Sequence, residues 1–176
     1  DNSGDALIVY GTATSDELRK IEWISTSSSW TNDAAITTTR TSGTVEWVEM
    51  TARATSSSNQ IGIAYSDSND DVSAYRWNGT STEYEATAVI RADASPSDLR
   101  KFDVSFEGIS GDMFVSIPLR TSDMGQGQLI GTSWTIGQFN VPDFISDFMD
   151  LQEPDPTSLN NDIMFIGHGN LSATNP

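Results

Sequence analysis

The sequence contains no cysteine, only two lysines, Lys20 and Lys101, and a single histidine, His168. Without cysteine the chain has no disulfide, no thiolate metal site and no thiol nucleophile. A lone histidine excludes a cluster of imidazole ligands, and a Ser-His-Asp triad would depend on His168 alone. No serine lies in the Gly-x-Ser-x-Gly turn of a hydrolase. We therefore predict no catalytic residue and expect a protein that is not an enzyme.

Positive charge is also scarce, with 9 basic residues against 25 acidic ones and a net charge of -16. This charge repels phosphate backbones and anionic lipid head groups, so we expect no nucleic acid partner. Long apolar runs are missing too, since a run such as ALIVY (6–10) is five residues long. A membrane-spanning helix needs about 20 apolar residues, so we predict no membrane insertion.

Calcium is the metal that an acidic surface suggests, because hard cations prefer oxygen ligands. The densest acidic cluster is SDSNDD, where Asp67, Asn69 and Asp71 are the candidate ligands. The cluster lacks the spacing of an EF-hand loop, and the same residues would build a hairpin turn between two strands. We expect no other cofactor.

Short strand-like stretches fill the chain up to about residue 120, and they are rich in Val, Ile, Thr and aromatic residues. Segments of Asn, Asp, Ser and Gly separate them, as in turns. A strand every 10 to 13 residues is typical of an all-β sandwich, barrel or propeller. We therefore predict an all-β fold.

The strands recur in order along the chain. SGDALIVYG (3–11) returns in altered form as SGDMFVSIP (110–118). Three aromatic pairs mark a unit of about 55 residues with four short strands, the size of one propeller blade. The pairs are Tyr10 with Tyr65, Trp23 with Trp77, and Trp47 with Phe102, at offsets of 55, 54 and 55 residues. The alternative is a duplicated β-sandwich.

The predicted organisation is two tandem β repeats, 3–58 and 59–115, followed by a degenerate third repeat and a C-terminal segment, 116–176. The third copy is expected to be lost in the Gly- and Gln-rich stretch DMGQGQ (123–128). A short helix is predicted from Pro142 to about Leu151, because Phe144, Phe148 and Leu151 fall on one helical face. The stretch DIMFIGHG (162–169) is predicted to be a final strand.

The phrases SGDALIVYG, VEWVEM, YRWNGTS and FDVSFEGISGD resemble the repeats of long, uncharacterised bacterial surface proteins. The likeness covers about Ser3 to Val115, and the chain departs from the pattern after Val115. The resemblance implies a β-propeller-like extracellular repeat at a cell surface and implies no catalytic activity. Asn78 and Asn170 begin sequons for N-glycosylation, which occur easily in a chain rich in Ser and Thr.

Aromatic side chains are the candidate ligand-binding residues, because their faces stack on sugar rings. Three tryptophans follow the repeat and are predicted to pack in the core: Trp23, Trp47 and Trp77. Trp30 and Trp134 lie in turn-like surroundings and are the candidates for an exposed pair that binds a surface glycan.

Self-association is the expected function. Two repeats and a fragment cannot close a propeller, which takes four to eight blades, and an open array exposes sheet edges and apolar faces. We expect other copies of the chain to cover them, in a head-to-tail surface filament or appendage. The residues predicted to self-associate are Ala6, Leu7, Ile8, Val9, Tyr10, Phe144 and Phe148. Of these, Ala6 to Tyr10 in the recurring SGD phrase are expected at a sheet edge or in a contact between subunits. A carbohydrate- or ligand-binding adhesin is the first alternative, and a glycan-acting hydrolase is the second.

Overall fold

The computed structural model describes residues 4–12, 17–36, 43–54, 58–78, 84–91, 102–118, 123–140, 146–152 and 164–169. In these ranges the chain is all-β, as the sequence predicts, and has no helix. The strands are β1 (Ala6–Gly11), β2 (Leu18–Ile24), β3 (Ser29–Trp30), β4 (Ala34–Ile36), β5 (Val45–Ala52), β6 (Ile61–Asp67), β7 (Val72–Trp77), β8 (Tyr84–Arg91), β9 (Asp103–Phe106), β10 (Met113–Pro118), β11 (Asp123–Ile130), β12 (Ser133–Asn140), β13 (Ser146–Gln152) and β14 (Met164–Gly169).

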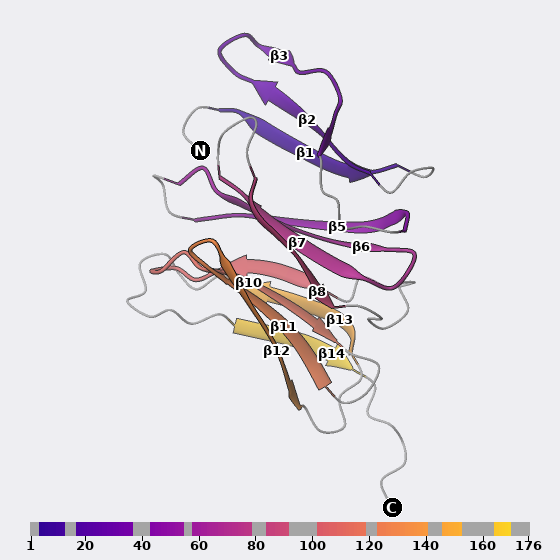
Figure 1. Cartoon of the computed structure of the whole chain (residues 1–176). Coiled ribbons are helices and arrows are strands. Elements are labelled where there is room, and N and C mark those ends of the chain that lie inside the picture. Colours follow the sequence, from indigo (N-terminus) through magenta and orange to yellow (C-terminus); the bar gives the residue numbers. More distant parts are fainter. Residues whose placement is uncertain are drawn as a thin grey trace, which may run out of the picture.

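The described strands form four antiparallel sheets, which follow one another along the chain and do not close into a barrel. The first contains β1 and β2, and both β3 and β4 pair with β2. The second has the order β5-β6-β7-β8 and the third β12-β11-β10-β9, whereas the fourth is the pair β13-β14. Figure 1 shows the first sheet stacked on the second and the second on the third, with the first sheet at one end of the stack.

The first and second sheets are held together by an apolar cluster between them. On β1, Leu7 and Val9 point to the second sheet, whereas Ala6 and Ile8 point away, because side chains alternate along a strand. The cluster comprises Leu7, Val9, Leu18 and Ile36 from the first sheet, and Val45, Val48, Ile61, Ile63, Tyr65, Tyr75 and Trp77 from the second.

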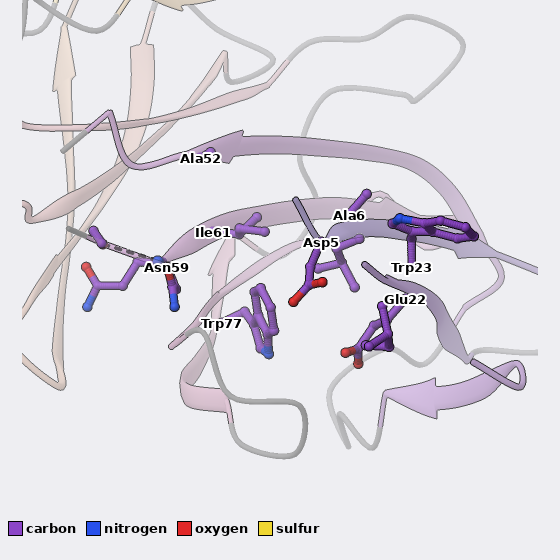
Figure 2. Close-up of a pocket in the computed structure, with 12 residues that line it drawn as sticks. Asp5, Ala6, Glu22, Trp23, Ala52, Asn59, Ile61 and Trp77 are labelled. Atoms are coloured by element: carbon purple, nitrogen blue, oxygen red, sulfur yellow. Dashed lines mark hydrogen bonds between the residues drawn. The ribbon is translucent and has the colours of Figure 1, made fainter. Parts of the chain in front are cut away.

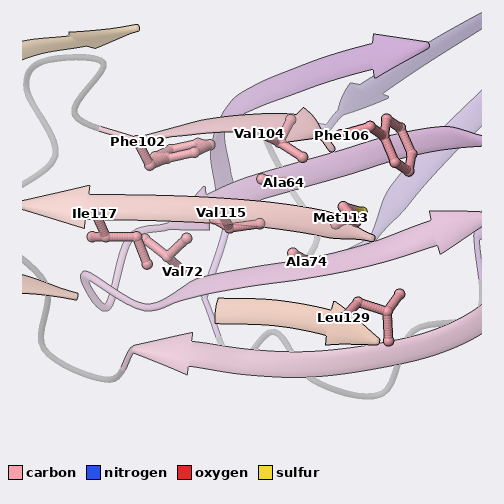
Figure 3. Packing of buried hydrophobic residues seen from close by; sticks show 10 residues of the cluster. All are labelled: Ala64, Val72, Ala74, Phe102, Val104, Phe106, Met113, Val115, Ile117 and Leu129. Carbon is pink, nitrogen blue, oxygen red and sulfur yellow. The ribbon is translucent and has the colours of Figure 1, made fainter. Parts of the chain in front are cut away.

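A second cluster lies between the second and third sheets (Figure 3). The second sheet contributes Ala64, Val72 and Ala74, none larger than valine. The third contributes mostly larger side chains, and the full set is Phe102, Val104, Phe106, Met113, Val115, Ile117 and Leu129. The two sheets approach so closely at Gly62 that an added Cβ would lie 2.9 Å from Val104 Cγ2. With both faces covered, β6 is buried along nearly its whole length.

Residues that are 54 or 55 positions apart in the sequence repeat occupy matching places in the first and second sheets. Ile8 lies opposite Ile21 in the first sheet, and Ile63 lies opposite Tyr75 in the second. The same register joins Ala6 to Trp23 and Ile61 to Trp77. By the offset between the SGD phrases, β10 corresponds to β1 and β6. We call β1, β6 and β10 counterpart strands.

The sheets begin one strand earlier than the sequence repeats. The second sheet starts with β5 (45–52), which belongs to the predicted repeat 3–58, and continues with β6, which belongs to 59–115. The third sheet likewise starts with β9, which precedes the second SGD phrase. Each of these sheets therefore takes its first strand from the preceding sequence unit.

The predicted helix from Pro142 to Leu151 is wrong in its described part. Ser146–Gln152 is β13, which pairs with β14, the predicted final strand. The Leu151 amide also donates to Asp103 Oδ2 of the third sheet, at 2.6 Å. A helix of about ten residues is marginal by itself, so strand pairing outweighs its helical periodicity. Phe144 lies outside the described residues.

The Gly- and Gln-rich stretch DMGQGQ, where the third sequence copy is expected to be lost, is part of a paired strand. These residues begin β11, which pairs with both β10 and β12. Gly125 and Gly127 lie opposite Ile117 and Val115, on the side of the third sheet that faces the second. Glycines on that side leave room for the neighbouring sheet, so a Gly-rich stretch is compatible with a paired strand here.

Trp47 is not in the core, contrary to the prediction. Its side chain is 41% exposed, whereas Phe102, to which it was aligned, is buried. A bulge between Val45 and Trp47 shifts the register, so that Val48 rather than Trp47 points to the first sheet. A shift of one residue moves every side chain to the other face of a strand.

Gly111 supports a direct test of the turn before β10. It has φ +69, and an added Cβ would lie 1.9 Å from the Arg53 guanidinium carbon. Gly131 has φ +58 and open space around it. We expect Gly131→Ala to lower the free energy of unfolding by about 1 kcal/mol and Gly111→Ala by about 2 kcal/mol, since the latter also displaces Arg53. Urea denaturation measures both, and equal losses would contradict the contact with Arg53.

Candidate functional site

The first sheet presents a partly apolar face to solvent, opposite the second sheet. We define this outer face by Ala6, Ile8 and Tyr10 of β1, Ile21 and Trp23 of β2, and Trp30 of β3. Cross-strand pairs place these side chains on one side of the sheet, because residues directly opposite each other point the same way. Ile8 is 46% exposed and Trp30 is 50% exposed. Among the described residues, no other sheet covers this face.

Two tryptophans meet at one end of the outer face. Trp23 and Trp30 lie opposite each other in β2 and β3, with ring centroids 5.5 Å apart and planes inclined by 60°. Trp23 is partly covered by this contact, while Trp30 remains half-exposed. The pair forms an angled aromatic surface rather than a flat platform.

A charged cluster lies at the other end of the outer face. Asp33 Oδ1 accepts from the Tyr10 hydroxyl at 2.7 Å and from Arg19 Nε at 2.9 Å. Arg19 also binds Glu17, with 2.8 Å between Nη1 and Oε2. Hydrogen bonds from Arg19 and then Tyr10 lower the pKa of Asp33, and the bond to Asp33 raises the pKa of Tyr10. These charges are already paired, so the cluster can border a contact surface without leaving an isolated charge.

A cavity of about 260 Å³ opens between one end of the first and second sheets. Figure 2 shows Asp5 and Ala6 of the first sheet near Ile61 and Trp77 of the second. At the opposite end of β1 the sheets meet closely, since a Cβ added to Gly11 would lie 2.5 Å from Val45 Cβ. The sheets therefore diverge from Gly11 toward Asp5. The complete lining is Asp5, Ala6, Leu7, Glu22, Trp23, Ile24, Ala52, Ser58, Asn59, Gln60, Ile61 and Trp77.

Two carboxylates line this cavity, and one of them, Glu22, belongs to a buried ion pair. Lys20 Nζ contacts Glu22 Oε1, and both side chains come from the face of β2 that points to the second sheet. Asp5 Oδ1 accepts from the Ser25 amide at 2.7 Å and fixes the chain just before β1. Both carboxylates therefore have structural roles in the first sheet.

The predicted calcium ligands lie in the turn between β6 and β7. Asp67 is buried, and its Oδ1 accepts from the amides of Asn69 at 2.9 Å and Asp71 at 3.2 Å. Its Oδ2 accepts from the Gly43 amide at 3.2 Å. Asp67 therefore ties the turn together, as the hairpin interpretation expects. The described part of the chain contains no group of three or more His, Cys, Asp or Glu residues arranged to hold a metal.

The predicted glycan-binding pair does not converge on one site. Trp30 belongs to the first sheet and is exposed, as predicted. Trp134 belongs to β12 of the third sheet, where it packs against the apolar cluster and its indole nitrogen is buried. Of the sequons, Asn78 follows β7 and is partly buried, and Asn170 lies outside the described residues.

The residues predicted to self-associate do not all lie on one surface. Ala6, Leu7, Ile8, Val9 and Tyr10 form β1, an end strand of the first sheet, which is the edge position that the sequence predicts. Leu7 and Val9 face the second sheet, so only Ala6, Ile8 and Tyr10 belong to the outer face. Phe148 lies in β13. Contact with a second chain stays a prediction.

The charged cluster was not predicted from the sequence. Asp33 lies 14 residues from Arg19 and 23 from Tyr10, and the segment between β3 and β4 brings it to them. Trp23 was predicted to be in the core, although its partner Trp30 lies only seven residues away along a short hairpin. A hairpin signal around TSSS (26–29) would have placed the two indoles opposite each other.

No helix in the ranges given above is both long and apolar enough to span a membrane. No protein-family model matches this chain, and the search of curated proteins finds no match.

Proposed function

We propose that this chain is a non-enzymatic structural module that self-associates by continuing its own stack of sheets at the outer face. The proposal includes the interpretation of the sheets as propeller-blade-like units of about 55 residues. Its resemblance to bacterial surface repeats supports an extracellular location, in a filament or appendage on a cell surface.

One observation carries the proposal. The outward-facing positions of β1 have counterparts on β6 and β10, and those counterparts are buried against the preceding sheet. Ile63 and Tyr65, the counterparts of Ile8 and Tyr10, are buried against the first sheet. The counterparts on β10 are buried against the second sheet, and they are Met113, Val115 and Ile117. Ile8 itself is 46% exposed.

The expected occupant of the outer face is a second copy of this chain. Within the chain, one face of each sheet contacts the opposite face of the next, which is a head-to-tail arrangement. Between chains, a head-to-tail contact gives a linear assembly when its rotation does not close a ring, and a linear assembly is the one proposed. Covering Ile8, Ile21 and Trp30 would remove apolar surface from water, at about 25 cal/mol for each Å² buried.

The test is the mass of the full chain in solution as a function of concentration. We expect light scattering to show a series of masses that grows with concentration. Ile8→Glu should reduce the mass to that of a monomer, because it would bury an unpaired carboxylate in the contact. Ile109→Glu is the matched control, since Ile109 is 53% exposed but lies in the turn between β9 and β10.

Three results would overturn parts of this proposal. A monomer at every concentration would overturn self-association. A dimer that grows no further would overturn the head-to-tail arrangement, because it would indicate that two outer faces contact each other. Equal effects of Ile8→Glu and Ile109→Glu would place the contact elsewhere. Adding soluble glycans tests the adhesin alternative, which requires binding that Trp30→Ala abolishes.

A further inference from the structure

The edge of β1 has no partner strand among the described residues. β1 pairs with β2 on one side only, whereas its counterparts β6 and β10 each lie between two strands. β5 is the additional neighbour of β6, and β9 is that of β10. In an end strand, alternate backbone N–H and C=O groups point away from the sheet and are available to another strand. Among the described residues, the first sheet therefore has no strand that corresponds to β5 and β9.

The side of β5 that would lie beneath such a strand is uncovered. Met50 and Ala52 pair with Ile63 and Ile61, so their side chains point toward the first sheet. Met50 is 38% exposed, and Ala52 is also exposed. The first sheet contacts β5 through β1. In the described ranges, the first sheet has no strand in the position of β9 that could also cover β5.

In the third sheet, the strand that corresponds to β5 is β9, and its side chains that point to the preceding sheet are covered. Val104 and Phe106 of β9 pair with Val115 and Met113, so they point toward the second sheet. Both are buried, and both β5 and β6 contact β9. The first strand of a sheet is thus covered by the first and second strands of the sheet before it. For β5, only the second of these, β1, is found in the part of the chain that the structure describes.

The cavity between the first and second sheets opens at this place. Ala6 and Leu7 of β1 line it, together with Ala52 of β5. Ile61 and Trp77 supply further apolar surface from the second sheet (Figure 2). A strand added beside β1 would direct every second side chain toward the second sheet, where this cavity provides volume.

We propose that the edge of β1 and the uncovered side of β5 form an acceptor site for an extended peptide segment. The segment would pair antiparallel with β1 and place apolar side chains at alternate positions over Met50 and Ala52. The chemistry of the occupant follows from β9, which fills the corresponding place beside β10 with Val104 and Phe106. This site combines the free edge of a strand with an adjacent cavity. A peptide that adds to such an edge is held by main-chain hydrogen bonds, and the cavity accepts its alternate side chains.

This inference goes beyond the proposed function, because it concerns the edge of the first sheet rather than its outer face. It also applies to a monomer. A chain that stays monomeric and binds the peptide would support the acceptor site while contradicting self-association, so the two proposals can fail separately.

The experiment uses the full chain and a labelled synthetic peptide with the sequence of residues 102–109, FDVSFEGI. We expect fluorescence anisotropy to show saturable binding, and hydrogen exchange to slow at outward-pointing amides of β1. Met50→Glu should weaken binding about tenfold or more, since it sets a carboxylate beneath the added strand. Ile136→Glu is the matched control, because Ile136 is 49% exposed on β12 of the third sheet.

A second peptide of the same composition tests the register. Exchanging each apolar residue with its polar neighbour moves the apolar set to the other face of the strand, so we expect this peptide to bind about tenfold or more weakly. The site is overturned by absence of binding of the first peptide, by equal binding of both peptides, or by protection at β8 or β12 instead of β1. Equal effects of Met50→Glu and Ile136→Glu would overturn it as well.

Discussion

Replacing Phe106 with alanine is expected to lower the free energy of unfolding by about 3–5 kcal/mol. Phe106 is completely buried in the cluster between the second and third sheets. The substitution removes a ring from a packed interior and leaves a cavity that the flanking strands cannot fill, because their ladders hold them in register. Since small domains are stable by about 5–15 kcal/mol, this loss is a large share of the total.

Ile109→Ala is the control for Phe106→Ala. Ile109 lies three residues further along and is 53% exposed, so its truncation should change the free energy by less than about 0.5 kcal/mol. Urea denaturation followed by tryptophan fluorescence and by circular dichroism measures both variants. A loss below about 1 kcal/mol for Phe106→Ala would contradict the packing of the third sheet on the second.

Replacing Asp67 with alanine is expected to cost about 3 kcal/mol or more. Its buried carboxylate accepts from the amides of Asn69, Asp71 and Gly43, and hydrogen bonds to a charged group contribute about 1.5–3 kcal/mol each. Without the carboxylate, two amides in the turn that joins β6 to β7 and one just before β5 lose this acceptor. Asp67→Asn keeps one carbonyl oxygen, so we expect it to lose less than Asp67→Ala.

Asp70→Asn is the matched control, because it removes the same charge from the same turn and asparagine tolerates the positive φ of 62° at this position. Thermal denaturation with and without calcium separates the two interpretations of the turn. We expect the midpoint of the wild-type chain to be the same in both conditions. A rise with calcium that Asp67→Asn abolishes would instead assign the carboxylate to a bound metal.

The strands and turns of the second sheet could be predicted from sequence because local patterns decide them. IGIAYSD is bounded by turn residues, and Asp67 serves the turn for which aspartate is suited. Ser146–Gln152 could not be predicted in the same way. Its apolar spacing fits a helix, and what decides its conformation is pairing with β14, which the local pattern of these residues does not indicate.

The register of β5 shows a second limit. The alignment matched Trp47 to Phe102 because both are aromatic, but the bulge after Val45 directs Val48 to the interface instead. A bulge adds one residue without a distinct sequence signal, and one residue reverses the two faces of a strand.

The candidate surface could be predicted in part. The recurrence of the SGD phrase pointed to β1 as an edge strand, and β1 is one. Sequence alone does not tell which alternate set of side chains is covered, Leu7 and Val9 or Ala6 and Ile8. That depends on the side on which the second sheet stacks, which is a long-range property of the fold.

The displacement between sheets and sequence units has a mechanical consequence. Because β5 belongs to one unit and β6 to the next, the two units are joined by a ladder of backbone hydrogen bonds from Val45–Asp67 to Ala52–Ile61. Separating the two units would therefore require breaking this ladder as well as the apolar packing between the first and second sheets. The two units are therefore held together by backbone hydrogen bonds, which tolerate sequence change, as well as by side-chain packing.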